Sequence, residues 1–213
     1  MSNARNLARV VADTSGAIAA TNLANAVPAD GSITNAKIVS VAASKLTGQV
    51  AKASAPSGSV IQVVQVKKTN TFSSGSQSFI DITGLSASIT PSSASNIILV
   101  SFVLNMSSNI AGWYGSQIQL VRNSTNIATG DSSGTMSPCT LDYSSDIGSS
   151  TLITPMPMQW SDAPATTSSV TYKLQMRSIQ GTTNWVNRST YDNGSDQFDA
   201  LVPSTITLME IAA

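Results

Sequence analysis

The stretch Gly58–Phe72, GSVIQVVQVKKTNTF, separates two unlike parts of the chain. Apolar residues at alternate positions predict a β-strand here, and the polar run KKTN at 67–70 ends that strand. The valines available to face a core are Val60, Val63 or Val64, and Val66. We therefore expect an extended N-terminal segment over residues 1–58 and a globular β domain over residues 59–213.

Charge and aromatic content both change at this stretch. Residues 1–58 hold five basic and two acidic residues, a net charge of +3, whereas residues 59–213 hold six basic and nine acidic residues, a net charge of −3. All eleven aromatic residues lie between Phe72 and Phe198. A segment without aromatics, with alanine as its main apolar residue, buries too little surface to fold alone. We predict that the N-terminal segment is ordered only against partners.

The low charge of the whole chain favours a protein that packs against copies of itself. Charged residues make up 10% of the sequence and the formal net charge is zero, whereas a globular protein usually carries about 25% charged residues. Identical subunits with few charges repel one another little. Neither part of the chain has the dense basic patch that nucleic-acid binding requires, so no nucleic-acid partner is expected.

The sequence argues against an enzyme. It contains no histidine and one cysteine, Cys139, which excludes a Ser-His-Asp triad, an intrachain disulfide and a cysteine-based metal site. It has neither a GxxxxGK phosphate loop nor a GxGxxG fingerprint. Composition leaves open a two-carboxylate glycosidase, but the single glutamate, Glu210, falls in the last predicted strand and the aspartates mainly occupy turns. We expect no catalysis and no cofactor.

No segment has the pattern of a membrane span or a secretion signal. No apolar run reaches the roughly 18 residues of a membrane-spanning helix. The first sixteen residues, MSNARNLARVVADTSG, lack the apolar core of a signal peptide. We expect synthesis in a cytoplasm without secretion and no membrane insertion, which leaves open release as part of a particle.

Two features of the N-terminal segment predict assembly. Residues 2–12 show the apolar spacing of a helix that is too short to be stable alone, so it either packs against partners or frays. The unit ITNAKI at 33–38 returns as VAASKL at 41–46, and each places a lysine beside the second of two apolar residues. Several copies around an axis would bury a thin seam covered by the lysine stems. The residues predicted to mediate assembly are Leu7, Val11, Ile33, Ile38, Val41 and Leu46.

Strand patterns separated by turns continue to the end of the chain. Residues 170–179 show the alternation most clearly, since Val170, Tyr172, Leu174 and Met176 share one face. This pattern predicts a mostly β protein with about eight strands in a C-terminal antiparallel β-sandwich or jelly roll. An extended N-terminal arm with a short helix precedes it. The other strands are predicted at 79–89, 97–106, 113–122, 151–160, 183–189 and 205–211.

Three segments allow a more specific prediction. Residues 97–106, IILVSFVLNM, are the most apolar and are expected to form a central strand buried on both faces. Residues 151–160 contain Pro155 and Pro157, which favours an edge strand. Residues 130–150 are loop-like. Their expected anchors to the core are Met136, Leu141 and Tyr143.

Aromatic residues near loops form a candidate glycan-binding set. Aromatic rings stack on sugars, while neighbouring amides and carboxylates bind hydroxyl groups. The alternative is that tryptophans in strands belong to the core. The candidates are Trp113, Tyr114, Trp185 and Tyr191, of which Tyr191 is the one most expected to be exposed.

A second candidate site lies close to Tyr191 in the sequence. Asp192, Asp196 and Asp199 surround Asn193 and Gly194, and carboxylate oxygens are the ligands that hard cations prefer. The spacing differs from that of an EF-hand loop. A polar hairpin loop without a cation is the alternative.

Several stretches resemble virion proteins of tailed bacteriophages, especially marine ones such as cyanophages. The segment NLANAVPADGSITNAKI at 22–38 and its echo AASKLTG at 42–48 resemble stalk and linker segments of tail fibres. Three later stretches resemble a β-sandwich module at the C-termini of such proteins. They are FIDITGLSASITPSSASNIILVSFVL at 79–104, SDAPATTSSVTYKLQMRS at 161–178 and STITLMEIAA at 204–213.

The resemblance implies a virion structural protein with two possible roles, and a third role stands apart from the resemblance. The first is a homotrimeric tail fibre or spike that docks on tail, adaptor or capsid proteins through residues 1–58 and presents the sandwich to a host surface glycan. The second is a decoration protein that stabilises the capsid. The third is a free carbohydrate-binding module. Copy number per particle separates the first two roles, and glycan affinity tests the third.

Overall fold

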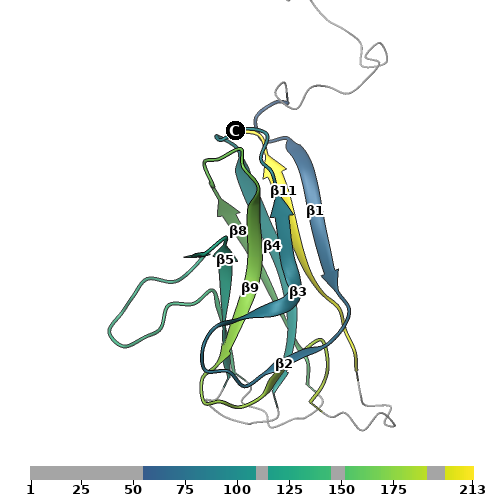
Figure 1. Cartoon of the computed structure of the whole chain (residues 1–213), viewed down its shortest axis with the longest axis vertical. Coiled ribbons are helices and arrows are strands. Elements are labelled where there is room, and N and C mark those ends of the chain that lie inside the picture. Colours follow the sequence, from purple (N-terminus) through teal and green to yellow (C-terminus); the bar gives the residue numbers. More distant parts are fainter. Residues whose placement is uncertain (1–54, 109–114, 145–151, 191–199) are drawn as a thin grey trace, which may run out of the picture. The chain divides into compact units, whose positions relative to one another are not determined.

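The computed structural model describes residues 55–108, 115–144, 152–190 and 200–213. These residues form eleven strands and no helix, and the strands make two antiparallel sheets that pack as a sandwich (Figure 1). The predicted fold class, mostly β with an antiparallel sandwich, is confirmed. The short helix and the assembly residues from Leu7 to Leu46 lie outside the described residues, and the boundary at residue 58 stays a prediction.

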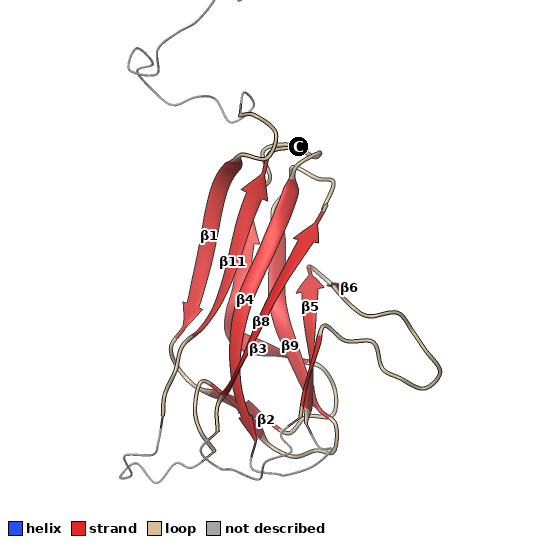
Figure 2. Ribbon diagram, turned by 180° about the vertical axis from the view of Figure 1, so that it is seen from behind, coloured by secondary structure: helices blue, strands red, loops and turns tan. Residues whose placement is uncertain are grey.

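One sheet has six strands and includes the stretch that divides the sequence. β1 (Val60–Lys68) pairs with β11, which pairs with the central strand β4, and β8 pairs with the other side of β4 (Figure 2). The short strands β10 and β2 continue the sheet beside the last residues of β4. The bounds of these strands are β2 (Phe72–Ser74), β4 (Ile97–Ser108), β8 (Thr154–Asp162), β10 (Asn184–Val186) and β11 (Ser204–Ile211).

The second sheet has five strands in the order β3, β9, β5, β6, with β7 paired to β5. The register between β3 and β9 shifts near Gly84, whose φ of 88° lies in the region that favours glycine. Asn123, at φ 53°, turns β5 back into β6. The bounds are β3 (Ile80–Ile89), β5 (Ser116–Arg122), β6 (Thr125–Ile127), β7 (Leu141–Tyr143) and β9 (Val170–Ser178).

Alternate residues of both sheets fill the interior. On β9, the four residues predicted to share a face are all buried. Phe102 on β4 is 1% exposed and belongs to the same core cluster. Each side chain of this size stabilises the fold by about 1.5–3 kcal/mol when fully buried. The core therefore lies between the sheets and holds both in register.

The structure shows which valines of β1 face the core. Val64 and Val66 pack against the core, whereas Val60 and Val63 are 55% and 56% exposed. The strand therefore has one apolar face toward the interior and two exposed valines on the other side.

Two predictions about the β4 to β8 region are wrong, and the others are confirmed. β4 is central as predicted, but its residues alternate between buried and half-buried, because only one of its faces meets the other sheet. Met136 is 76% exposed and anchors nothing, whereas Tyr143 is buried and Leu141 packs against the core. Among the described strands β8 pairs with β4 alone, so its prolines lie on an edge strand as expected.

The two ends of the sandwich differ in the chain segments that lie there. We call the first the entry end, because the chain joins the sandwich there at Ala55, close to Asn96, Ala212 and Ala213. We call the opposite end the loop end. Strands β1, β4 and β9 finish there, and strands β5, β8 and β11 begin there.

Candidate functional site

The residues that flank two predicted ligand-binding segments, and those that flank 145–151, meet at the loop end. The described residues that flank 109–114, 145–151 and 191–199 are Ser108 and Gly115, Ser144 and Leu152, and Thr190 and Ala200. Strand pairing brings these flanks together, since Ser116 pairs with Tyr143 and Met106 pairs with both Thr154 and Val186. Three separate parts of the chain thus leave and re-enter the sandwich at one end.

Trp185 is the predicted glycan-binding residue that the structure describes. It lies on β10 between Ser107 of β4 and Ser73 of β2 and is half-buried. The Arg188 guanidinium lies 5.9 Å from the centre of its ring. Trp185 is therefore held on a strand beside a loop, with part of its surface accessible. Its role in glycan binding stays a prediction.

The other predicted site residues lie outside the described residues. They are Trp113, Tyr114 and Tyr191 of the glycan set and Asp192, Asp196 and Asp199 of the cation set. Within the described ranges, no group of three or more His, Cys, Asp or Glu side chains is placed to hold a metal ion. The cation site is therefore neither supported nor contradicted by the part of the chain that the structure describes.

The interior becomes polar toward the loop end. Asn184 and Ser108 are register partners on adjacent strands, and Ser116 lies on the inner side of the other sheet. All three are buried, and Asn184 Oδ1 and the two Ser Oγ atoms have no hydrogen-bond partner among the described residues. The apolar core thus stops short of this end, and its last layer consists of buried polar groups.

Asn187 organises the backbone beneath the loop end. Its side-chain amide donates to the carbonyl oxygens of Lys68 at 2.8 Å and Asn70 at 3.0 Å, and its Oδ1 accepts from the Ser204 hydroxyl. Its main-chain N–H donates to the Asn105 carbonyl. At φ 67°, the residue adopts a conformation that asparagine tolerates better than most. One side chain therefore ties β1, β11 and the segment after β10 together.

Lys68 is a buried cation at the same end. It is 2% exposed, and its ammonium donates to Asn70 Oδ1 at 2.7 Å and to the Thr71 carbonyl at 3.4 Å. The aliphatic stem passes beside Gly84, and the ammonium lies 5.9 Å from the Phe72 ring. Burial lowers the pKa of the Lys68 ammonium below its usual value.

Glu210 is the corresponding buried carboxylate at the entry end. It is 0% exposed and accepts hydrogen bonds from Gln62, from Asn96 and from both the N–H and the hydroxyl of Ser92. Burial raises the pKa of this carboxyl, but the hydrogen bonds outweigh burial and hold the pKa below its usual value. The carboxylate thus stays ionised without a cationic partner.

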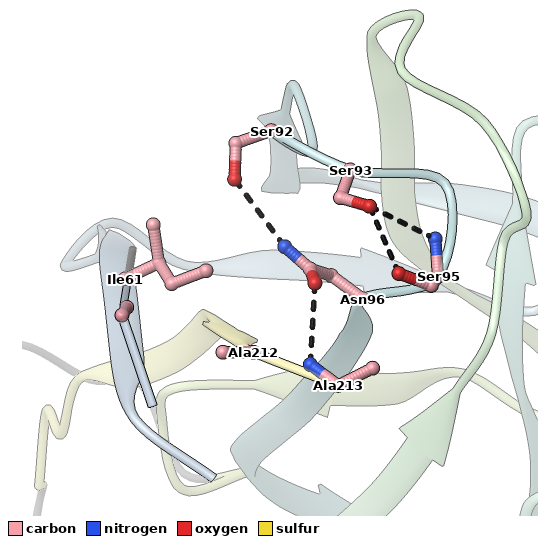
Figure 3. A pocket seen from close by; sticks show the side chains of 8 residues that line it. Ile61, Ser92, Ser93, Ser95, Asn96, Ala212 and Ala213 are labelled. Atoms are coloured by element: carbon pink, nitrogen blue, oxygen red, sulfur yellow. Dashed lines mark hydrogen bonds between the residues drawn. The ribbon is translucent and has the colours of Figure 1, made fainter. Parts of the chain in front are cut away.

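A pocket of about 210 Å³ opens beside this network. Figure 3 shows Asn96 at its centre, joined to Ser92 and to the Ala213 N–H. Ile61 and Ala212 supply apolar walls, and the hydroxyls of Ser93 and Ser95 bond to each other. Neutral polar groups and small apolar groups line the pocket, with no nucleophile held next to a base. This arrangement suits binding or packing rather than catalysis.

Sequence reasoning missed these buried polar residues, although a signal was present. Glu210 faces the same side of β11 as the buried Ile206 and Leu208. Lys68 faces the same side of β1 as Val64 and Val66. Alternation alone would have placed both side chains inward. Their charge argued for an exposed position, and the partners that offset burial come from distant segments.

Comparisons with known proteins find no family. No family and no curated protein matches the sequence. The structure of the VP2 subviral particle of infectious bursal disease virus is 18% identical, with 71% of this chain and 37% of that chain covered and a TM-score of 0.33. The T=1 particles derived from infectious bursal virus show 16% identity, 71% and 36% coverage, and a TM-score of 0.34. This chain spans little more than a third of those proteins, and similarity this low carries no functional argument.

The described residues were also searched for a membrane-spanning helix. They include no helix long and apolar enough to cross a bilayer.

Proposed function

We propose that this chain is a structural protein of a bacteriophage particle, a homotrimeric tail fibre or spike component. Residues 1–58 dock it on tail, adaptor or capsid proteins, and the sandwich contacts a glycan of the host surface. The observation that carries the proposal is that the two ends of the sandwich differ. The described chain begins at Ala55, at the entry end, while Trp185 and the flanks of 109–114, 145–151 and 191–199 lie at the opposite end.

Three further observations support a binding role over a catalytic one. The sequence lacks histidine and carries 10% charged residues. Besides the cations Lys68 and Arg188, the buried and half-buried polar groups described at the loop end are mainly amides and hydroxyls. Neutral polar groups beside an aromatic ring are the chemistry that recognises sugars, because the ring stacks on the apolar face of a sugar while amides bind its hydroxyl groups. The resemblance to tail-fibre segments points the same way.

The glycan step is tested with the full chain on an array of bacterial surface polysaccharides. We expect binding to at least one polysaccharide, and Trp185→Ala should weaken it about tenfold, as expected for an aromatic contact of roughly 1.4 kcal/mol. Trp160→Ala is the matched control, because Trp160 is 39% exposed on β8 of the same sheet and pairs with Val100, away from the loop end. Absence of binding across the array would remove host adhesion from the proposal.

The structural role is tested on purified particles. Copy number decides between the two virion roles, because a fibre is present in tens of chains or fewer per particle and a decoration protein in hundreds. We expect the lower number, and deletion of residues 2–50 should abolish incorporation. A count in the hundreds would favour a capsid decoration protein that stabilises the shell.

A further inference from the structure

We propose that the outward face of the six-stranded sheet is an interface between copies of this chain. We call the part of this face formed by β1, β11, β4 and β8 the flat face. Figure 2 shows these four strands side by side. The inference concerns the sandwich itself and stands whether or not the loop end binds a glycan.

The flat face is almost free of charge. Its register rows run across the four strands, for example Val63, Met209, Leu99 and Ser161 in one row and Gln65, Thr207, Ser101 and Gln159 in the next. Among the outward-facing residues of these four strands, the single charged side chain is Lys67, at the end of β1. The remaining ones are aliphatic, proline, serine, threonine, asparagine or glutamine.

The opposite face of the sandwich is built differently. Lys173 on β9 bonds to Asp81 on β3 at 2.9 Å, and Arg177 bonds to Gln117 on β5. Asp142 on β7 adds a fourth charge. Among the outward-facing strand residues that the structure describes, this face therefore carries more charges than the flat face.

The flat face also carries exposed apolar side chains and a groove. Val60 and Val63 are more than half exposed on β1. Between β4 and β8 runs a shallow groove of about 290 Å³, bordered by Ser101, Val103, Pro157 and Gln159. The face thus has exposed valines at one edge and a groove at the other, and a second protein surface can fit this shape.

Charge complementarity identifies the occupant as a second copy. In a symmetric contact the same patch must suit itself, so a charge on it needs an opposite charge at the position that it meets on the second copy. An uncharged face with threonine, serine and glutamine is self-compatible, and the cores of protein interfaces are likewise depleted of charge. A partner of opposite charge would find nothing to recognise here.

The size of the face sets the expected strength. Four strands spaced about 4.8 Å apart and eight residues of about 3.4 Å each give roughly 500 Å² per copy, or about 1,000 Å² for two copies. This total lies near the lower limit for a specific interface. The contact should therefore be weak and depend on protein concentration unless other segments reinforce it.

Thiol labelling of the full chain tests the inference. In a Cys139→Ser background, Thr207→Cys places a thiol in the centre of the flat face. Thr171→Cys is the matched control, because Thr171 is also half-buried on the outer face of a strand, in the other sheet. As protein concentration rises, maleimide labelling of Thr207→Cys should slow about tenfold, by mass action. Labelling of Thr171→Cys should not change.

A charge on the flat face completes the test. Val63→Asp or, as a milder change, Gln65→Glu should restore rapid labelling of Thr207→Cys at high concentration, with an unchanged circular dichroism spectrum. A chain that sediments as a monomer at all concentrations would overturn the inference. So would an oligomer in which Thr207→Cys labels as fast as Thr171→Cys, since the copies would then meet through another surface.

Discussion

At the residue scale, Glu210 shows how a carboxylate can be buried without a cation. Its side chain accepts four hydrogen bonds from Gln62, Ser92 and Asn96, which replace the water lost on burial. The network connects β1, the turn before β4 and β11 at the entry end. The negative charge therefore helps to hold the place where the N-terminal segment joins the sandwich.

The pH dependence of stability follows from this network. Because the hydrogen bonds hold the folded-state pKa of Glu210 below its usual value, Glu210 stabilises the fold above the unfolded-state pKa, near 4.3. That contribution is lost as the pH falls through the folded-state value. Glu210→Gln should lower the free energy of unfolding by about 2–4 kcal/mol at neutral pH, since an amide cannot accept all four bonds. The same variant should flatten the loss of stability below pH 5, measured by urea unfolding at several pH values.

Asp142→Asn is the control for the sign of this effect. Partial burial of the carboxyl raises the pKa of Asp142, so this group opposes folding slightly as the pH rises past its unfolded-state pKa. Removing it should not flatten the acid limb. An unchanged acid limb in Glu210→Gln would show that another group controls acid unfolding.

The residue scale is also where prediction from sequence is weakest. The inward position of Lys68 and Glu210 follows from strand alternation, but their partners do not, because Ser92 and Asn187 lie more than a hundred residues away along the chain. A single sequence shows which side of a strand a residue faces. It does not show which distant amide or hydroxyl will satisfy it.

At the element scale, a buried cluster fastens the edge strand β8 to the opposite sheet. The Asp162 carboxylate on β8 accepts two hydrogen bonds from Arg122 on β5, at 2.9 and 3.0 Å, and one from the Tyr172 hydroxyl on β9, at 2.6 Å. Asp162 is 8% exposed. Burial and the neighbouring carboxylate both raise the pKa of Tyr172, so its hydroxyl stays a donor at all ordinary pH values.

Asp162→Ala should loosen β8 selectively. The change leaves the buried Tyr172 hydroxyl without its acceptor and Arg122 without its ion pair, which costs about 3 kcal/mol. Because β8 pairs with β4 alone among the described strands, hydrogen exchange should accelerate more in β8 than in β11. Asp81→Ala is the control. The Asp81 side chain is 54% exposed, and its ion pair with Lys173 contributes less than about 1 kcal/mol. Equal acceleration in both strands would mean that the cluster supports the whole sandwich instead.

Long elements could be predicted from the sequence, whereas most short ones could not. β9 and β4 extend over nine and twelve residues, long enough for alternation to show, and the prolines of β8 marked its edge position. The strands β2, β6, β7 and β10 have three residues each, and of these four only β10 falls within a predicted strand, the one at 183–189. A segment of that length has no measurable period, so its pairing depends on the surrounding sheet.

At the scale of the whole molecule, the difference between the two ends of the sandwich could not be predicted from the sequence. The sequence shows that aromatic residues and aspartates cluster in certain loops, but only the strand order places the flanks of 109–114, 145–151 and 191–199 at one end. The same order places Ala55 at the opposite end. The uncharged flat face likewise emerges only from the register, because its rows combine residues from four distant strands.

The boundary between the N-terminal segment and the sandwich gives the last prediction. Gly58 N–H donates to the Ala212 carbonyl at 2.8 Å, and the Ser59 N–H donates to the Pro56 carbonyl at 3.0 Å. A piece spanning residues 55–213 keeps both bonds, whereas a piece spanning 59–213 loses them. We expect both pieces to unfold cooperatively, because the core lies entirely after residue 59.

The shorter piece should be less stable by about 1–2 kcal/mol, as expected for two hydrogen bonds at a strand end. For a domain of this size, that difference lowers the midpoint of thermal unfolding by a few degrees. Circular dichroism at a protein concentration low enough to keep both pieces monomeric measures it. Equal midpoints would show that the sandwich begins at Ser59, whereas failure of the longer piece to fold would show that the sandwich needs residues 1–54.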